Sequence, residues 1–218
     1  MGLPGTVPVR LVLADDEALL RQGLRVLLEA DGRVEVVAEA ADGAGLLDVV
    51  RRCRPDVALV DVQMPGMDGL AALKALLAWP DPPALAVLTT FDLDDYVARA
   101  LELGAQGFLL KDAEPDALVR AVLDLAAGGA VLDPRITARL LPKLRTATLR
   151  QDAQIDGLSA RERQVLGLLA NGQPNSASAA SLGLSEATVK SYVSTVLTKL
   201  GVENRVQAAL VAHRVGTW

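Results

Sequence analysis

Residues 9–128 alternate short apolar runs with longer runs of helical periodicity, and this alternation restricts the fold more than any other feature. The strand candidates are 9–14, 34–40, 56–62, 84–90 and 107–111, and the helical patterns are 17–30, 43–53, 70–79, 92–104 and 115–128. Three of the strand candidates are almost wholly apolar, as are parallel strands that are covered on both faces. Strands that alternate with helices form a parallel sheet between helical layers. We therefore predict an α/β doubly wound domain with a five-stranded parallel sheet.

The remainder of the chain follows a different pattern. Residues 129–154 contain Pro134, Pro142 and a polar run, which is typical of a linker, and one short helix is expected near 135–141. From Leu158 onward the pattern is helical only. The expected helices are 159–170, 175–182, 185–200 and 204–215, and the first of them begins with the capping-box residues Ser159 and Glu162. The sequence thus predicts an α/β domain over 8–128, a linker over 129–154 and a small all-α domain over 155–218.

Charge and composition narrow the classes of function. The net charge is −5, but residues 1–157 carry 16 Lys and Arg against 24 Asp and Glu, whereas residues 158–218 carry 6 against 3. An acidic front and a mildly basic tail indicate two modules with different partners. The single cysteine, Cys53, excludes an internal disulfide, and the single histidine, His213, excludes a multi-histidine metal site. Since the sequence has no apolar stretch of membrane-spanning length and no signal-peptide start, we expect a cytoplasmic protein.

Polar residues that could carry chemistry stand where four of the predicted strands end. Asp15 and Asp16 follow the first strand, Asp61 the third, Thr89 the fourth and Lys111 the fifth. These strand ends share one edge of a parallel sheet. Neighbouring anions repel unless a cation joins them, Mg²⁺ prefers oxygen ligands, and a carboxylate beside the metal can form an aspartyl phosphate. Polar side chains are common at strand ends for structural reasons alone, but this combination favours a magnesium-dependent phosphorylation site.

Four motifs in residues 9–128 resemble those of the receiver domains of two-component response regulators. They are Ala14-Asp-Asp-Glu17, Asp61-Val-Gln-Met-Pro-Gly-Met-Asp-Gly69, Leu88-Thr-Thr-Phe-Asp92 and Gly104-Ala-Gln-Gly-Phe-Leu-Leu-Lys-Asp112. The resemblance implies a flavodoxin-like fold in which Asp61 is the phosphoacceptor. It also implies a Mg²⁺ cofactor held by Asp15, Asp16, Asp61 and the backbone carbonyl of Gln63.

The same resemblance implies roles for residues around the phosphoryl group. Thr89 and Lys111 would sense the phosphoryl group, and Phe108 would be the switch aromatic of the family. Because Phe108 has no hydroxyl group, it can report only by rotating its ring between packed and exposed positions. Asp68 could be mistaken for a further metal ligand, but a turn and N-cap role before the helix that starts at Leu70 is favoured.

The helix expected over 185–200 has an apolar stripe and a polar face flanked by lysines, which suits a DNA major groove or an ordinary amphipathic helix. Leu158-Ser-Ala-Arg-Glu-Arg-Gln-Val-Leu166, Gly183-Leu-Ser-Glu-Ala-Thr-Val-Lys-Ser-Tyr-Val193 and Thr198-Lys-Leu-Gly-Val202 resemble the LuxR-type helix-turn-helix, which with a receiver defines the NarL/FixJ class. The DNA contacts implied are Thr188, Val189, Lys190, Ser191, Tyr192, Ser194 and Lys199. The dimerisation surface implied is Val206, Ala209, Leu210 and Val211.

One segment departs from the LuxR-type pattern. Where the family has Asn-x-Glu-Ile-Ala, this chain has Asn175-Ser-Ala-Ser-Ala179, and Pro174 before it is also unusual. Ala177 replaces an acidic residue, and Ser178 replaces an apolar residue that packs under the recognition helix. The lost apolar side chain is expected to cost about 1–3 kcal/mol of stability.

Together these features predict a phosphorylation-dependent DNA-binding transcriptional regulator, not an enzyme. A sensor histidine kinase would phosphorylate Asp61, and the active homodimer would bind inverted or direct half-sites on double-stranded DNA. A magnesium-dependent phosphatase or phosphotransferase is one alternative, but Gln63 stands where such enzymes need an acid-base carboxylate. A constitutive DNA-binding regulator with a silent receiver is the other, and the complete set of site residues argues against it.

Overall fold

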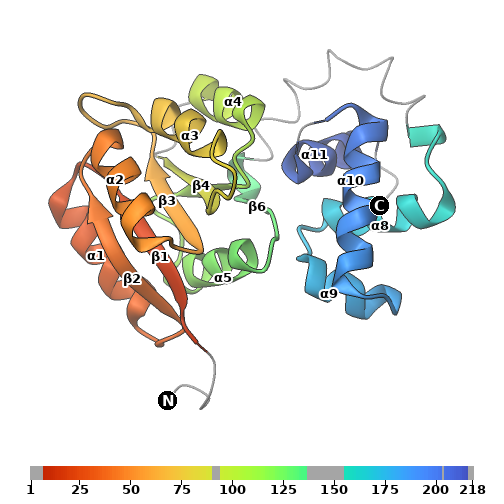
Figure 1. Ribbon diagram of the computed structural model, residues 1–218, viewed down its shortest axis with the longest axis horizontal. Helices are drawn as coiled ribbons and strands as arrows, with labels where there is room; N and C mark the ends of the chain where they lie inside the picture. The colour runs from red at the N-terminus through yellow and green to blue at the C-terminus, as the bar shows by residue number, and fades with distance from the viewer. Residues whose placement is uncertain (1–6, 90–93, 137–154, 203, 216–218) are drawn as a thin grey trace. The chain divides into compact units, whose positions relative to one another are not determined.

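The computed structural model of the chain describes residues 7–89, 94–136, 155–202 and 204–215 (Figure 1). The chain forms two compact units, Met1–Ala126 and Ala127–Trp218, and each is described here by itself. The first unit is a parallel α/β fold and the second contains the helices of the C-terminal part. The predicted fold class, an α/β sheet domain followed by a small helical domain, is therefore confirmed.

The sheet is built from parallel strands that match the predicted apolar runs. They are β1 (Val9–Ala14), β2 (Val34–Ala40), β3 (Val57–Asp61), β4 (Ala84–Thr89) and β5 (Gly107–Leu110). Parallel pairing joins β1 to β2 and β3, β3 to β4, and β4 to β5. Strand β1 therefore lies between β2 and β3, so the connection from β1 to β2 and that from β2 to β3 run in opposite directions along the sheet. The carboxyl ends of β1 and β3 border the crevice at this change of direction.

The strand count differs from the prediction. The sheet has six strands in the order β2-β1-β3-β4-β5-β6, not five, because the two-residue strand β6 (Val131–Leu132) is added beside β5. Two residues are too few to produce a periodicity of their own, so these residues were predicted as part of the linker. Residues 134–136 are helical, and the rest of the short helix expected near 135–141 lies outside the described residues.

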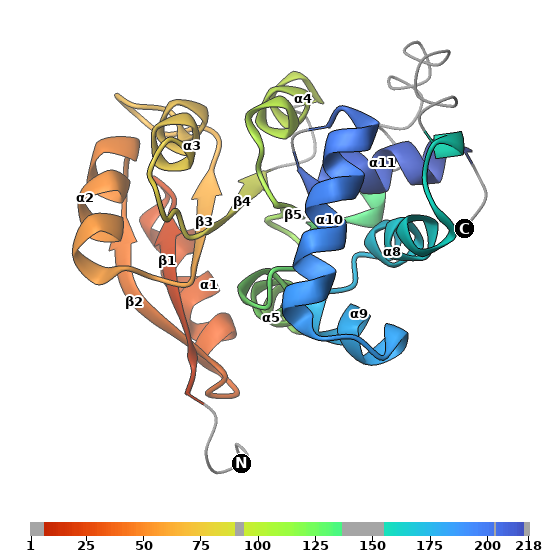
Figure 2. The same ribbon diagram turned by 45° about the vertical axis from the view of Figure 1, so that its right-hand side comes forward.

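Helices cover both faces of the sheet (Figure 2). They are α1 (Ala18–Glu29), α2 (Gly43–Cys53), α3 (Gly69–Leu77), α4 (Asp94–Leu103) and α5 (Pro115–Ala126). Helix α1 packs beside α5, whereas α2, α3 and α4 follow one another. All residues of β3 and β5 are buried, which explains their almost continuous apolar sequences.

The second unit is a helical domain around its own core. Its helices are α8 (Ala160–Ala170), α9 (Asn175–Leu182), α10 (Glu186–Leu200) and α11 (Arg205–Val215). The predicted capping box of Ser159 and Glu162 is present at the start of α8. Gly183 has a φ of 64°, which glycine tolerates better than other residues, and it ends α9 before Ser185 caps α10. The turn between α9 and α10 is therefore specified locally.

The departure at α9 lies inside this helical domain. Pro174 occupies the N-cap position of α9 and supplies the carbonyl that accepts from the Ser178 N–H at 3.0 Å. The side chain of Ser178 is buried, with 2% exposure. A hydroxymethyl group therefore fills an interior position at which the family pattern has a larger apolar side chain.

The residues predicted to form a dimer surface lie on α11. Val206, Ala209, Leu210 and Val211 are between 0% and 6% exposed in the single chain. Val211 belongs to the core that also contains Leu166, Val196 and Leu200. Val206, Ala209 and Leu210 are not among the residues of that core, so a dimerisation role for this part of α11 stays a prediction.

A buried arginine links α11 to the segments that precede α9. The Arg205 guanidinium donates to the backbone carbonyls of Gly128 and Gln173, the latter at 2.6 Å, and to Asn175 Oδ1 at 3.3 Å. Burial lowers the pKa of Arg205 to about 10, so the group stays charged at neutral pH. These bonds join three parts of the second unit.

The longest helix among the described residues is α10, with 15 residues. Spanning a bilayer takes about 20 predominantly apolar residues. No helix in the described part of the chain has the length and apolar character for a membrane span.

Candidate functional site

Strand ends bring Asp15, Asp61 and Lys111 together at one edge of the sheet. The Lys111 ammonium lies 2.8 Å from Asp15 Oδ2 and 2.9 Å from Asp61 Oδ2. Glu17 Oε1 lies 3.6 Å from the same nitrogen, and the Glu17 N–H donates to Asp15 Oδ1 at 2.8 Å. Asp15 and Asp61 are both buried. Glu17 was not predicted as a site residue, although its position directly after two aspartates was a signal.

Burial and charge act in opposite directions on these groups. Burial raises the pKa of the Asp61 carboxyl above its ordinary value, although the Lys111 ammonium acts to lower it. Burial acts to lower the pKa of Lys111, but hydrogen bonds to Asp15 and Asp61 outweigh burial and raise it. One ammonium thus faces two buried carboxylates, and the excess negative charge favours a further cation.

The carboxylates also provide a donor set for a metal ion. One oxygen from each of Asp15, Asp16 and Asp61 lies within 4.8 Å of the other two. Asp15 Oδ2 is fully buried and, apart from its ion pair with Lys111, has no well-directed hydrogen bond to any described residue. Mg²⁺ prefers carboxylate oxygens and usually keeps several water ligands. Because Asp16 is exposed, this donor set fits a Mg²⁺ ion that is partly open to solvent.

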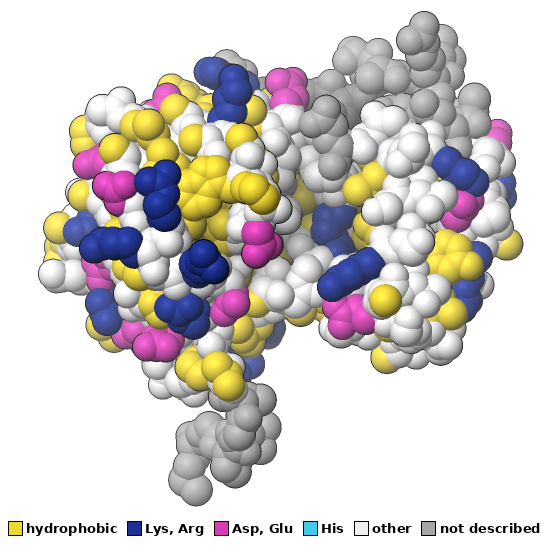
Figure 3. All heavy atoms as spheres, in the orientation of Figure 1, with side chains coloured by type: hydrophobic (Ala, Val, Ile, Leu, Met, Phe, Trp, Pro, Cys, Tyr) yellow, Lys and Arg dark blue, Asp and Glu magenta, His cyan; other side chains and the backbone are white. Residues whose placement is uncertain are grey.

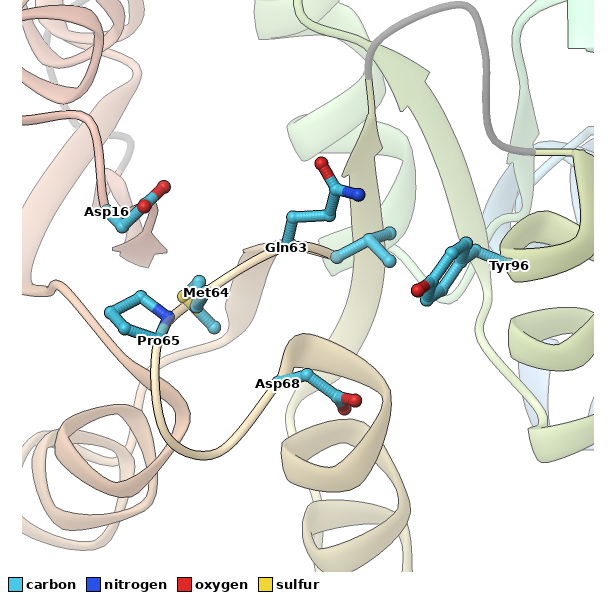
Figure 4. Close-up of a pocket in the computed structure, with 7 residues that line it drawn as sticks. Asp16, Gln63, Met64, Pro65, Asp68 and Tyr96 are labelled. Carbon is cyan, nitrogen blue, oxygen red and sulfur yellow. The ribbon is translucent and has the colours of Figure 1, made fainter.

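The loop between β3 and α3 forms a wall of an open cleft beside these carboxylates (Figure 4). The cleft has a volume of about 400 Å³, and its lining residues are Asp16, Val62, Gln63, Met64, Pro65, Asp68 and Tyr96. Tyr96 reaches the cleft from α4, and no sequence motif marked it, since only the fold brings α4 to this loop. Asp68 Oδ1 accepts from the Ala71 N–H at 2.7 Å, which confirms its predicted N-cap role.

Thr89 and Phe108 lie on the strands beyond the phosphoacceptor candidate. Leu88 is paired with Asp61 across β3 and β4, so Thr89 stands one residue further toward the crevice. Thr89 is 1% exposed, and its carbonyl accepts from the Lys111 N–H at 3.0 Å. The Phe108 ring is fully buried, which corresponds to the packed one of its two expected positions. Thr90, which ends the predicted fourth strand, lies outside the described residues.

The outer face of α10 carries the candidate DNA contacts. Thr188, Lys190, Ser191, Ser194 and Lys199 are exposed. In Figure 3 the surface along α10 is mainly white, the colour of uncharged polar side chains and backbone. Val189, a further predicted DNA contact, is fully buried in this structure, so its side chain is not accessible here. Tyr192 is half-buried and packs against the helical core, so only part of its side chain is accessible.

Glu162 ties the end of α10 to the start of α8. Its carboxylate accepts from the Ser159 N–H at 2.7 Å and from the Lys199 ammonium at 2.8 Å. The hydrogen bond from Lys199, followed by that from Ser159, lowers the pKa of Glu162. The capping box was visible in the sequence, but the partner 37 residues away was not. Lys199 therefore has a structural ion pair as well as an exposed position.

Glu162→Gln is expected to reduce the free energy of unfolding of the helical domain at pH 7. Because the folded-state pKa of Glu162 is lowered, its stabilisation is present above the ordinary glutamate pKa of about 4.3 and is lost as the pH falls through the folded pKa. Denaturation followed by circular dichroism should show a difference from the wild type at neutral pH that shrinks in acid. Glu186→Gln is the control, because its 3.5 Å pair with Lys190 is exposed. The same difference at both pH values would contradict this account.

Comparisons with known proteins agree with the geometry of both units. The response regulator receiver domain family matches residues 11–123, and the bacterial regulatory proteins of the luxR family match residues 156–212. The DNA-binding transcriptional activator DevR/DosR of Mycobacterium tuberculosis is 42% identical over 94% of each chain. This chain belongs to the response regulators. As in the NarL class, a receiver domain precedes a LuxR-type DNA-binding domain.

Solved structures support the same assignment for this response regulator. The response regulator ChrA of a heme-sensing two-component system is 38% identical, with a TM-score of 0.55 over 95% of this chain and 98% of ChrA. RcsB, in a structure of two dimers bound to two parallel DNAs, is 28% identical, with a TM-score of 0.57 over 97% of this chain and 100% of RcsB. The similarity thus extends over both domains. These relatives are regulatory proteins.

Proposed function

We propose that this response regulator accepts a phosphoryl group on Asp61 from a sensor histidine kinase and that phosphorylation controls DNA binding. One observation carries the proposal: the buried Asp61 carboxylate lies 2.9 Å from the Lys111 ammonium and beside the carboxylates of Asp15 and Asp16. A nucleophile, a metal-binding set and a neutralising cation are the parts that phosphoryl transfer requires.

The roles of the individual groups follow from this arrangement. A Mg²⁺ ion held by Asp15, Asp16, Asp61 and the Gln63 backbone carbonyl would supply neutralisation of the phosphoryl charge. Asp61 attacks phosphorus while the bond to the donor nitrogen breaks, which leaves an acyl phosphate on Asp61. Lys111 then neutralises a phosphoryl oxygen, and the Thr89 hydroxyl donates to another. The chain is modified once instead of turning over a substrate, so it acts as a regulator and not as an enzyme.

The output would follow from a change in the packing of the receiver. Thr89 and Phe108 lie on the adjacent strands β4 and β5. A phosphoryl group that draws Thr89 and Lys111 toward Asp61 would bias β4, β5 and the neighbouring helices between two packings. Phe108 is fully buried in this structure and would change its ring position with that bias.

Intact-protein mass spectrometry tests the phosphorylation proposal. The full chain is incubated with a small-molecule phosphodonor and MgCl₂, and a parallel sample contains EDTA. We expect one phosphoryl adduct with Mg²⁺ and almost none with EDTA. An absence of adduct with both a small donor and candidate histidine kinases would favour the constitutive DNA-binding regulator with a silent receiver.

The second partner in this proposal is double-stranded DNA, read by α10. Thr188, Lys190, Ser191 and Ser194 would face the major groove, with Tyr192 and Lys199 at its flanks. The RcsB structure, which contains dimers on DNA, supports a homodimer on paired half-sites, and Val206, Ala209, Leu210 and Val211 of α11 are the proposed dimerisation residues. A regulator that binds chromosomal DNA would act in the cytoplasm, which is the localisation proposed for this protein.

Lys190→Ala is expected to weaken DNA binding to a similar degree on different sequences. Its ammonium forms a 3.5 Å ion pair with Glu186, but both side chains are exposed. Because an exposed ion pair contributes little, the ammonium remains available for a phosphate. Removal of one phosphate contact should lower the slope of log affinity against log salt by about 1. Fluorescence anisotropy at several salt concentrations measures this slope. The control is Lys74→Ala on the exposed side of α3, and an unchanged slope in Lys190→Ala would contradict the assignment.

A further inference from the structure

The loop that carries Gln63 is tied to the rest of the receiver domain at two glycines. At the end of the loop, the Gly69 N–H donates to the Val62 carbonyl at 3.0 Å. Before that, the Met67 carbonyl accepts from the Gly43 N–H, also at 3.0 Å. Gly43 is the first residue of α2, so this second tie joins the loop to a helix that is distant in sequence.

The contact at Gly43 leaves no room for a side chain. A Cβ atom there would lie 2.6 Å from the Met67 carbonyl oxygen, 2.7 Å from Met67 Cγ and 3.0 Å from Met67 Cβ. The nearest atom belongs to the backbone, so the loop itself would have to move. Gly43 is not among the described residues with positive φ, so its backbone conformation does not require glycine. The close approach of the loop is the remaining physical reason for glycine at this position.

We infer that Gly43 is a positioning residue for the metal ion, because its contact with Met67 fixes the loop that presents the Gln63 carbonyl. This inference rests on the proposed function. Figure 4 shows Gln63, Met64 and Pro65 in succession on this loop, with Asp16 across the cleft. Met64 is buried and Gln63 is exposed, so the loop is anchored on one side and open toward the crevice on the other.

The metal is sensitive to such positioning. Mg²⁺ demands near-ideal octahedral geometry, so a shift of a few tenths of an ångström in one carbonyl ligand weakens binding. Loss of a group that supports a metal ligand typically reduces affinity by about 10–100-fold. The three heavy atoms nearest to a Cβ at Gly43 all belong to Met67, so the effect of Gly43 would pass through the backbone from Met67 to Gln63.

The same helix provides a matched control at Gly45. A Cβ atom there would lie 3.4 Å from Asp42 Oδ1 and 3.8 Å from Ala40 Cβ, which are ordinary contacts, and it would not meet the loop. Gly43→Ala and Gly45→Ala therefore make the same chemical change in the same turn of α2. Only the first should displace Met67.

The experiment is calorimetric titration of the full chain with MgCl₂. We expect Gly43→Ala to bind Mg²⁺ about tenfold more weakly than the wild type and Gly45→Ala to bind it with wild-type affinity. The free energy of unfolding of each variant is also measured in EDTA. A merely structural role of Gly43 would change this stability without changing the Mg²⁺ affinity of the folded protein. Equal affinities for the wild type and Gly43→Ala would overturn the inference.

A second variant keeps the test decisive if Gly43→Ala does not fold. Met67→Gly removes the side chain that packs on Gly43 and loosens the loop backbone, and it should weaken Mg²⁺ binding roughly two- to fivefold. Unchanged affinity in Met67→Gly would then overturn the inference. Failure of the proposed function would appear differently, as a wild-type protein that binds Mg²⁺ but forms no phosphoryl adduct.

Discussion

Asp61→Asn is expected to abolish phosphoryl uptake completely at any concentration of donor and Mg²⁺. The amide is not a nucleophile, and the nearby carboxylates of Asp15 and Asp16 are engaged with Lys111 or placed to bind the metal. Intact-protein mass spectrometry should show one adduct for the wild type and none for the variant. Peptide mapping of the wild-type adduct should place it on Asp61.

Asp68→Asn is the matched control for this result. It makes the same substitution in the lining of the same cleft, and asparagine is as good an N-cap as aspartate. We expect an adduct close to the wild-type amount. An adduct that persists in Asp61→Asn would contradict the assignment of the phosphoacceptor. The Asp61→Asn variant should also be more thermally stable in EDTA, because burial raises the pKa of Asp61 and its charge is therefore disfavoured by folding.

Arg205→Ala is expected to destabilise the helical domain by about 3 kcal/mol. The substitution removes the donors to Gly128, Gln173 and Asn175 and leaves an unfilled interior space. Part of this loss is offset, because the variant no longer has to bury a charged group. The cost of that burial in the wild type is seen in the Arg205 pKa, which burial lowers to about 10. The free energy of unfolding from denaturant titration measures the effect, and DNA binding should fall with the folded fraction.

Two further variants separate this effect from a general loss of charge. Arg163→Ala removes an exposed guanidinium with a single 3.0 Å bond to the Asp156 carbonyl and should change stability by less than about 0.5 kcal/mol. Arg205→Lys keeps the charge but not the fork of donors, so its loss should lie between the two. A change in Arg205→Ala no larger than that in Arg163→Ala would show that the buried bonds are not stabilising.

Much of the fold could be predicted because local chemistry specifies the ends of its elements. The predicted bounds of β1, β2, α2 and α9 agree with the structure, and Asp42 and Gly183 cap two of these helices. The strand β6 could not be predicted, because its two residues pair with a sheet that only the tertiary fold supplies.

Some residues of the candidate site could likewise be predicted from the sequence, and others could not. The meeting of Asp15, Asp61 and Lys111 follows from parallel strand order, which places their strand ends at one edge. Tyr96 and the contact of Gly43 with Met67 depend on how helices approach the loop after β3, and no spacing in the sequence encodes that approach.

In the helical domain, an apolar pattern alone does not separate a core position from a functional surface. Val211 was predicted on a dimer surface, but in the structure it belongs to the core of this domain. A small domain must bury most of its apolar residues to be stable, so apolar positions on its helices are claimed first by the core. Polar residues of α10 such as Lys190 and Ser194 are exposed, as the sequence pattern indicated.

The most direct test of the switch is the DNA affinity of three samples of the full chain. They are the wild type with phosphodonor and Mg²⁺, the wild type without donor, and Asp61→Asn with donor. A duplex selected from a random pool by the phosphorylated protein serves as the ligand, and fluorescence anisotropy gives the dissociation constants. We predict that the phosphorylated wild type binds roughly tenfold more tightly than the other two samples, which should agree with each other. Equal affinity in all three samples would contradict control of DNA binding by Asp61.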